Sequence, residues 1–251
     1  MTTMDRVPNL NPEQSVGAWV TADYRLAALF ERHGIDFCCG GDKPLTTACA
    51  EQGVSPETLL DEIRQVTAVA DGGEQYDQWA LDFLADYIVN QFHTSNRQTM
   101  PQIADYAATV ADVHGAAHPE TVAIARLWPQ VQGEMGMHMQ REELLIFPYI
   151  KRLVRSQEEG VAPKPLANGS LKELIVKLEA EHEATGDALA DLARLCGGYT
   201  PPADACPTYR TLYALLAQFD ATTKKHVHLE NNILFPKAIR LEEAVFETVP
   251  A

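Results

Sequence analysis

The sequence lacks a long apolar run, and this excludes a membrane-spanning helix. Although 46% of its residues are hydrophobic, no stretch approaches the roughly 18–20 apolar residues that a helix needs to cross a bilayer. The first residues, MTTMDRVPNLNPEQSV, are polar and contain no apolar segment of the kind found in a secretory signal peptide. We therefore expect a cytoplasmic protein that makes no membrane contact.

Basic residues and cysteines are also scarce. The chain has 20 lysines and arginines against 35 acidic residues, a net charge of −15. Since no basic cluster offsets this excess, we expect no binding to nucleic acid, whose phosphates attract positive charge. The five cysteines are odd in number, and Cys38 and Cys39 are adjacent. This arrangement does not fit the disulfide framework of a small secreted domain, so the thiols are expected to be reduced.

Residues 1–72 predict a small helical domain. Apolar residues follow helical spacing through SVGAWVTADYRLAALFERHG (15–34), which ends at a glycine suited to a helix C-cap. A second helix is predicted from Ser55, a good N-cap residue that is followed by proline. The stretch between them, IDFCCGGDKPL (35–45), carries turn signals. The following DGGEQ (71–75) is typical of a short flexible linker.

The remainder, 77–247, predicts a four-helix bundle. Four segments have helical periodicity, namely 77–114, 119–157, 170–196 and 207–245. Strand alternation is almost absent from this region. Pro101 and Pro129 fall inside the first two, so a kink or a restart is expected at each. The predicted fold is all-α, an up-down-up-down bundle preceded by the small helical domain.

One eleven-residue string occurs twice in this region, as HMQREELLIFP (138–148) and HVHLENNILFP (226–236). Each copy has His, three residues, Glu, and later two aliphatic residues, Phe and Pro. Residues four apart share one face of a helix, so each copy presents an imidazole beside a carboxylate. A single pair of this kind is expected by chance and reads as a surface contact. Two pairs with the same continuation indicate a pseudo-twofold site.

Two further histidines complete this pattern, His93 at 45 residues before the first copy and His182 at 44 residues before the second. With a rise of about 1.5 Å per residue, their distances to the intervening turns place all these side chains at one depth. Four imidazoles and two carboxylates would be costly to bury without a cation. The candidate metal ligands are His93, His138, Glu142, His182, His226 and Glu230.

This ligand set predicts a dinuclear site. If both glutamates bridge, each metal receives two nitrogens and two carboxylate oxygens, which leaves positions for an oxo bridge, oxygen, nitric oxide or water. Mixed imidazole and carboxylate ligands with open positions favour iron or manganese over a closed zinc site.

The motifs resemble the iron–sulfur cluster repair di-iron proteins (the RIC, or repair of iron centres, family), which join an N-terminal Asp-Phe-Cys-Cys-Gly-Gly domain to a hemerythrin-like bundle. The resemblance rests on the two long strings and on DFCCGG (36–41), YIVNQFH (87–93), EHE (181–183) and PPADAC (201–206). It implies two iron ions per chain, bridged by oxo and carboxylate groups, on the same six ligands. It also implies repair of iron–sulfur clusters damaged by nitrosative or oxidative stress, by iron donation. The implied partners are damaged iron–sulfur proteins and small ligands such as nitric oxide or oxygen.

Several alternatives stay open at this level. Cys38 and Cys39 are either small buried hydrophobic residues or a thiol pair for redox chemistry or iron hand-off. Glu143 and Glu181 flank ligands and could support them, although a solvated face is the simpler interpretation. Either His114 or His118 could join the site, whereas His228 should point away from His226.

Two other functions compete with repair. One is a hemerythrin-like sensor that binds nitric oxide or oxygen, and the other is a di-iron nitric oxide reductase. The ligand set does not separate them, so whether the protein is an enzyme stays open. Homodimer formation is also left open.

Overall fold

The computed structural model describes residues 10–68, 74–161, 163–166 and 169–248, so residues 71–73 of the predicted linker lie outside it. In these ranges the chain is helical and has no strand, which confirms the predicted all-α fold. No helix of the described residues is both long and apolar enough to cross a membrane. Contacts divide the chain into two units, 1–80 with 227–237, and 81–226 with 238–251. The domain division predicted from the sequence, 1–72 and 77–247, stays a prediction.

The first unit contains four short helices and one 3-10 turn, and its helices pack around Trp19, Phe30 and Leu45, which are fully buried. Their bounds are α1 Val16–Ala22, α2 Leu26–Arg32, α3 Leu45–Gln52, α4 Pro56–Thr67 and η1 Tyr76–Gln78. Helix α4 begins as predicted, because the Ser55 hydroxyl accepts a hydrogen bond from the Thr58 amide at 3.3 Å.

The segment 15–34 forms two helices rather than one. Asp23 ends α1 with extended backbone angles. Its carboxylate accepts hydrogen bonds from the Arg25 amide at 3.0 Å and from Arg25 Nε at 2.9 Å. Such a local side-chain turn competes with helical hydrogen bonding, so the apolar periodicity alone did not reveal the break.

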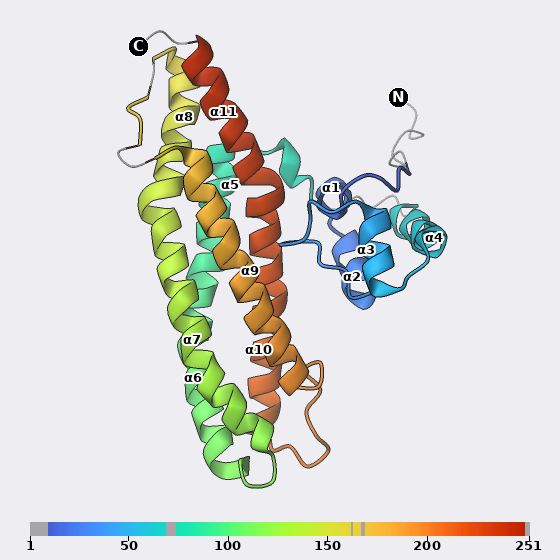
Figure 1. The fold of residues 1–251 in the computed structure, drawn as a ribbon. Coiled ribbons are helices and arrows are strands. Elements are labelled where there is room, and N and C mark those ends of the chain that lie inside the picture. Colours follow the sequence, from blue (N-terminus) through green and yellow to red (C-terminus); the bar gives the residue numbers. More distant parts are fainter. Residues whose placement is uncertain (1–9, 69–73, 162, 167–168, 249–251) are drawn as a thin grey trace. The chain divides into compact units, whose positions relative to one another are not determined.

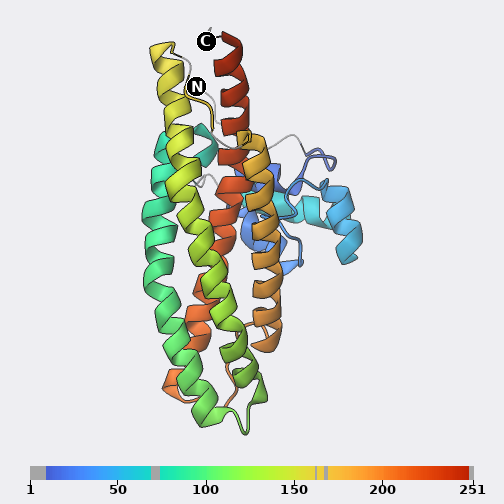
Figure 2. The same cartoon turned by 60° about the vertical axis from the view of Figure 1, so that its left-hand side comes forward.

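Four long helical rods form the bundle, and Figures 1 and 2 show them side by side with alternating direction. Their parts are α5 Leu81–Ile88, η2 Val89–His93 and α6 Thr94–His114; α7 Pro119–Arg141, η3 Glu142–Ile146 and α8 Phe147–Glu159; α9 Leu171–Leu195; and α10 Pro207–Leu229, η4 Glu230–Leu234 and α11 Phe235–Thr248. The predicted four-helix bundle is thereby confirmed. Helices α6 and α7 continue through Pro101 and Pro129, so neither proline causes a restart.

A large apolar cluster joins α6, α7, α9 and α10. Trp128 lies at its centre, with its ring centroid 5.0 Å from that of Phe219. The indole N–H donates a hydrogen bond to the Met100 carbonyl oxygen at 3.1 Å, so this buried polar group is satisfied. This packing holds the rods in register independently of any ligand.

Three of the rods contain one π-helical turn each, namely η2, η3 and η4. In η3 and η4 the amides of Phe147 and Phe235 donate to carbonyls five residues earlier. The prolines that follow, Pro148 and Pro236, have no N–H, and their rings would clash with a carbonyl four residues earlier in a regular helix. A wider turn relieves this conflict at Pro148 and Pro236, whereas α6 and α7 contain Pro101 and Pro129 without one. Turns of this type are frequent at functional sites.

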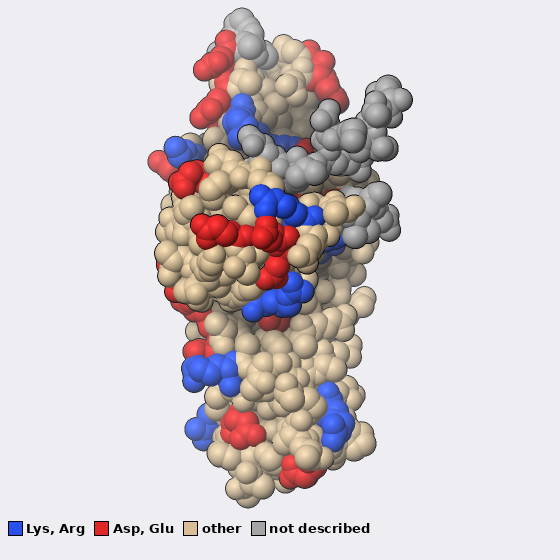
Figure 3. Space-filling model, turned by 90° about the vertical axis from the view of Figure 1, so that its right-hand side faces the viewer, with Lys and Arg blue, Asp and Glu red and all other residues tan. Residues whose placement is uncertain are grey.

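Charged side chains are mixed by sign on the face drawn in Figure 3. Lysines and arginines lie among acidic residues there and form no continuous basic patch on that face. The absence of nucleic acid among the partners stays a prediction.

Two glycines of the first unit allow a close approach of Asn232. A Cβ on Gly17 would lie 2.0 Å from Asn232 Oδ1, and one on Gly41 would lie 2.5 Å from the same atom. The Gly17 amide also donates to the Gly41 carbonyl oxygen at 2.7 Å. No other residue type fits at these two positions without displacing Asn232.

We predict that Gly41→Ala lowers the free energy of unfolding by about 1–3 kcal/mol, because the added methyl group overpacks this contact. The control is Gly133→Ala in α7, where the added Cβ meets nothing within 4 Å. That change should be stabilising by about 0.5–1 kcal/mol, because alanine is the better helix former. Urea unfolding followed by circular dichroism measures both, and equal midpoints for the two variants would contradict the close packing at Gly41.

Candidate metal centre

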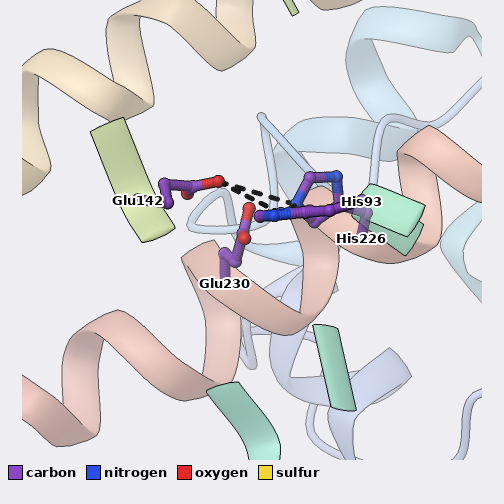
Figure 4. A group of neighbouring side chains, drawn as sticks. All are labelled: His93, Glu142, His226 and Glu230. Carbon is purple, nitrogen blue, oxygen red and sulfur yellow. Dashed lines mark hydrogen bonds and ion pairs between the residues drawn. The ribbon is translucent and has the colours of Figure 1, made fainter. Parts of the chain in front are cut away.

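Six buried side chains converge in two overlapping groups. The first group contains His93, Glu142, His226 and Glu230, and the second contains His138, Glu142, His182 and Glu230. Within each group the candidate ligand atoms all lie within 4.8 Å of one another. Figure 4 shows the carboxylates of Glu142 and Glu230 directed towards the imidazoles of His93 and His226. The structure therefore brings together all six side chains that the sequence singled out, and both carboxylates belong to both groups.

Every rod contributes to this centre. His138, His182 and His226 lie in the regular helices α7, α9 and α10, while His93 ends the π turn η2. Glu142 and Glu230 are the first residues of η3 and η4. Three of the six side chains thus lie in π turns.

The histidines are arranged as two close pairs. His93 Nε2 lies 3.0 Å from His226 Nε2, and His138 Nε2 lies 2.9 Å from His182 Nε2. Two nitrogens bound to one metal at about 2.1 Å would be about 3.0 Å apart at a right angle and about 3.4 Å apart at a tetrahedral angle. The two nitrogens of each pair therefore lie close enough together to bind one ion.

Glu142 is fully buried between these pairs. Its Oε2 lies 3.4 Å from His93 Nε2 and 3.3 Å from His138 Nε2, yet neither carboxylate oxygen accepts a hydrogen bond from the described residues. Burial opposes ionisation, but the charge and contacts of His138, His93 and His226 outweigh it and hold the pKa of Glu142 well below its ordinary value. A buried carboxylate whose pKa is lowered by surrounding imidazoles fits a site built for a cation.

His93 Nδ1, the ring nitrogen that points away from His226, contacts the carboxylate of Glu143, which also binds Arg97. His93 Nδ1 lies 2.7 Å from Glu143 Oε1, which also accepts a hydrogen bond from Arg97 Nη2 at 2.6 Å. Partial burial opposes ionisation of Glu143, but the hydrogen bonds from Arg97 and His93 keep its pKa below the ordinary value. A carboxylate at Nδ1 fixes the tautomer that leaves Nε2 free to bind metal.

The same arrangement recurs at His138. Its Nδ1 lies 3.0 Å from Glu181 Oε2, and Arg141 donates to the other oxygen of this carboxylate. The hydrogen bond from His138, aided by the charge of Arg141, lowers the pKa of Glu181. These side chains line a surface groove between α7 and α9, together with Met137 and Ala184. Glu143 and Glu181 are therefore not simply solvated residues, since each is bound to a candidate ligand.

The vicinal cysteines lie in a loop of the first unit that turns around Asp36. The Asp36 carboxylate accepts hydrogen bonds from the amides of Cys38 at 2.9 Å, Cys39 at 3.0 Å and Gly40 at 2.8 Å, and from the Cys38 thiol at 3.2 Å. Contact with Cys39, burial and the Asp36 charge raise the pKa of Cys38 well above its ordinary value. Cys38 is buried and Cys39 is partly exposed, so only one of the two fits the interpretation as a core residue.

Two asparagines that the sequence did not single out fix the backbone of this loop. Asn231 Nδ2 donates to the Cys38 carbonyl oxygen at 3.4 Å. Asn232 Nδ2 lies 3.3 Å from the carbonyl oxygens of both Phe37 and Cys38. The available signal was the difference between the two copies of the string, because Asn231 and Asn232 replace Glu143 and Leu144 of the first copy.

His228 belongs to the same contact. Its ring centroid lies 5.8 Å from those of Tyr24 and Phe37, and its Nδ1 lies 3.1 Å from Asn232 Nδ2. It is in neither metal group, as expected from its position two residues after His226.

His114 and His118 are also in neither group. His114 Nε2 contacts Cys206 Sγ at 3.2 Å. His118 contacts Asp204 at 3.1 Å and Glu120 at 3.2 Å, and these two carboxylates raise its pKa. The question of whether either histidine joins the centre is therefore answered for the described structure, because both have partners elsewhere.

Comparison with known proteins agrees with this geometry. The family described as hemerythrin HHE cation binding domain matches residues 84–238, and the ScdA_N domain, a domain of unknown function, matches residues 12–67. The iron-sulfur cluster repair proteins YtfE of Yersinia pestis (strain Pestoides F) and Yersinia pseudotuberculosis serotype O:1b (strain IP 31758) are each 33% identical over 229 residues. These matches cover 91% of this chain and 98% of each relative. The chain belongs to the hemerythrin-like iron–sulfur cluster repair family. The family resemblance predicted from the sequence is thus confirmed, and the chain contains a cation-binding domain.

We predict that Glu142→Ala removes most of the bound metal, because this carboxylate is shared by both groups. Metal analysis and the near-ultraviolet charge-transfer absorption of the iron-loaded protein measure the loss. Glu230→Ala should behave in the same way. The matched control is Glu183→Ala, which removes an exposed carboxylate next to His182. Full metal content in either shared-carboxylate variant would contradict a bridging role.

We further predict that Glu143→Gln and Glu181→Gln each weaken metal affinity by about 10–100-fold, the usual effect of removing a carboxylate partner from a ligating histidine. Competition with a chelator measures this change while the ligands themselves stay in place. Affinities equal to that of the unsubstituted protein would show that the two carboxylates serve only surface ion pairs with Arg97 and Arg141.

Proposed function

We propose that this protein restores iron–sulfur clusters damaged by nitrosative or oxidative stress, and that it does so by donating iron from a two-iron centre. The observation that carries the proposal is the sharing of Glu142 and Glu230 by both histidine pairs. Two metals held in this way would each have two imidazole nitrogens and two bridging carboxylates. The Yersinia relatives are named for iron–sulfur cluster repair, which supports the same role.

In this proposal His93 and His226 would hold one iron, His138 and His182 would hold the other, and Glu142 and Glu230 would be shared between them. Bound iron would supply exchangeable ions and open positions for small ligands such as nitric oxide or oxygen. Glu143 and Glu181 orient one imidazole of each pair and accept its Nδ1 proton in a hydrogen bond.

Cys38 and Cys39 are proposed to take part in the hand-off. They belong to a loop whose backbone is fixed by Asn231 and Asn232, the two residues that directly follow Glu230. The partners are damaged iron–sulfur proteins, and the protein acts as an iron donor rather than as a reductase.

The test uses iron-loaded full-length protein and a dehydratase whose iron–sulfur cluster has been damaged by nitric oxide. We expect dehydratase activity to return in proportion to the iron supplied, with about one donor used per repair event. Iron-free Glu142→Ala protein and an equal amount of ferrous iron held by a chelator are the controls. Catalytic consumption of nitric oxide with a reductant, without repair, would instead identify a reductase. Tight binding of nitric oxide without repair or consumption would identify a sensor.

A further inference from the structure

Three potential ligands lie together outside the histidine and glutamate centre. The Asp36 carboxylate, Cys38 Sγ and Cys39 Sγ all lie within 4.8 Å of one another. We propose that they form a second cation site, which takes a borderline divalent ion such as ferrous iron. This inference rests on the proposed function, which supplies the iron: the loop would be a transfer site for iron that leaves the histidine and glutamate centre.

The spacing of the sulfurs fits a single ion. Cys38 Sγ and Cys39 Sγ are 3.9 Å apart. Two thiolates that bind one tetrahedral ion at about 2.3 Å would be about 3.8 Å apart. Asp36 Oδ1 lies 3.2 Å from Cys38 Sγ, close to the roughly 3.5 Å expected for an oxygen and a sulfur on the same tetrahedral ion. Shifts of a few tenths of an ångström would therefore bring these two pairs of atoms to tetrahedral spacing.

Asp36 is placed to serve as the third ligand. Three of its hydrogen bonds come from backbone amides, those of Cys38, Cys39 and Gly40. The fourth comes from the Cys38 thiol. The Cys38 and Cys39 amides and the Cys38 thiol all bind Oδ1, whereas the Gly40 amide binds Oδ2. A cation that replaces the thiol proton would share Oδ1 with the two amides, whose contacts keep the carboxylate in place.

The loop is fixed before any ion binds. The side-chain amides of Asn231 and Asn232 hold the Phe37 and Cys38 carbonyl oxygens. Gly41 lies close to Asn232, since a Cβ added at this glycine would lie 2.5 Å from Asn232 Oδ1. A preorganised loop loses little conformational freedom on binding an ion, so these contacts favour the site.

The site is incomplete in a way that suits transfer. Asp36 is exposed and Cys39 is partly exposed, whereas Cys38 is buried. Three protein ligands leave a fourth tetrahedral position for water or for a ligand of the receiving protein. In the binding step two S–H bonds are replaced by two sulfur–metal bonds, and two protons pass to water. The ion keeps its charge, so the step needs no oxidant or reductant.

Cobalt(II) is the probe that distinguishes this site from the other centre. Thiolate-to-cobalt charge transfer absorbs in the near ultraviolet, and the centre of histidines and glutamates contains no sulfur. We expect the band in the full-length protein and in Glu142→Ala. It should be lost in the double variant Cys38→Ser/Cys39→Ser. Asp36→Asn should lower the affinity for cobalt by more than about 10–100-fold, the usual effect of removing a group that only hydrogen-bonds to a ligand.

The matched control is Cys206→Ser, because Cys206 lies 3.2 Å from His114 Nε2 and is the other thiol in contact with a potential ligand among the described residues. The band should survive this change. Absence of the band in the unsubstituted protein, or its loss in Cys206→Ser with retention in the double variant, would overturn the proposal.

A second measurement needs no variant. Ferrous iron should slow alkylation of Cys39 in the unsubstituted protein by about tenfold at tenfold excess over the dissociation constant, and unchanged rates would overturn the site. The outcome is separable from repair. A cobalt band together with normal repair by the double variant would confirm the site and refute the hand-off. No band together with iron-dependent repair would refute the site and leave the function intact.

Discussion

The burial of ionised carboxylate at the centre of an apolar bundle is the constraint from which the rest of the structure follows. Glu142 is fully buried and its oxygens accept no hydrogen bond from the described residues. Its charge is tolerated only beside positive charge, which protein imidazoles supply in part and a cation supplies fully. Two of the imidazoles are oriented by carboxylates, His93 by Glu143 and His138 by Glu181. Glu143 also binds Arg97, and Glu181 also binds Arg141. From the bundle axis to the surface, a carboxylate is thus followed by an imidazole, a second carboxylate and an arginine.

A second constraint concerns the proline of the doubled string, because the helix continues past it after the histidine and glutamate. Each copy ends in Phe-Pro, and each proline removes one helical hydrogen bond. The π turns η3 and η4 accommodate this loss and begin at the glutamate, four residues after the candidate histidine ligand. Beyond the shared ligands the copies diverge. The first uses Glu143 to hold His93, whereas the second uses Asn231 to hold the cysteine loop.

The sequence predicted the bundle and the convergence of the six side chains, because both depend on regular helix geometry. The rods predicted at 170–196 and 207–245 are observed as Leu171–Leu195 and Pro207–Thr248. The six converging side chains followed from a constant rise per residue. The π turns were not predicted, since an extra residue in one turn barely changes apolar periodicity. The break at Asp23 depends on a local ion pair with Arg25, and the contacts of Asn232 join segments about 195 positions apart, which no local pattern encodes.

One helical turn contains both a candidate metal ligand and a residue that contacts the cysteine loop. Glu230 belongs to both metal groups, and the next residue, Asn231, donates to the Cys38 carbonyl oxygen. His228, two residues before Glu230, is fully buried against Tyr24 and Phe37. The backbone of this turn is therefore held on one side by ligand geometry and on the other by the loop. The candidate ligand Glu230 and Asn231, which contacts the thiol loop, are thus adjacent in the π turn η4. A change in the backbone of this turn would move both side chains.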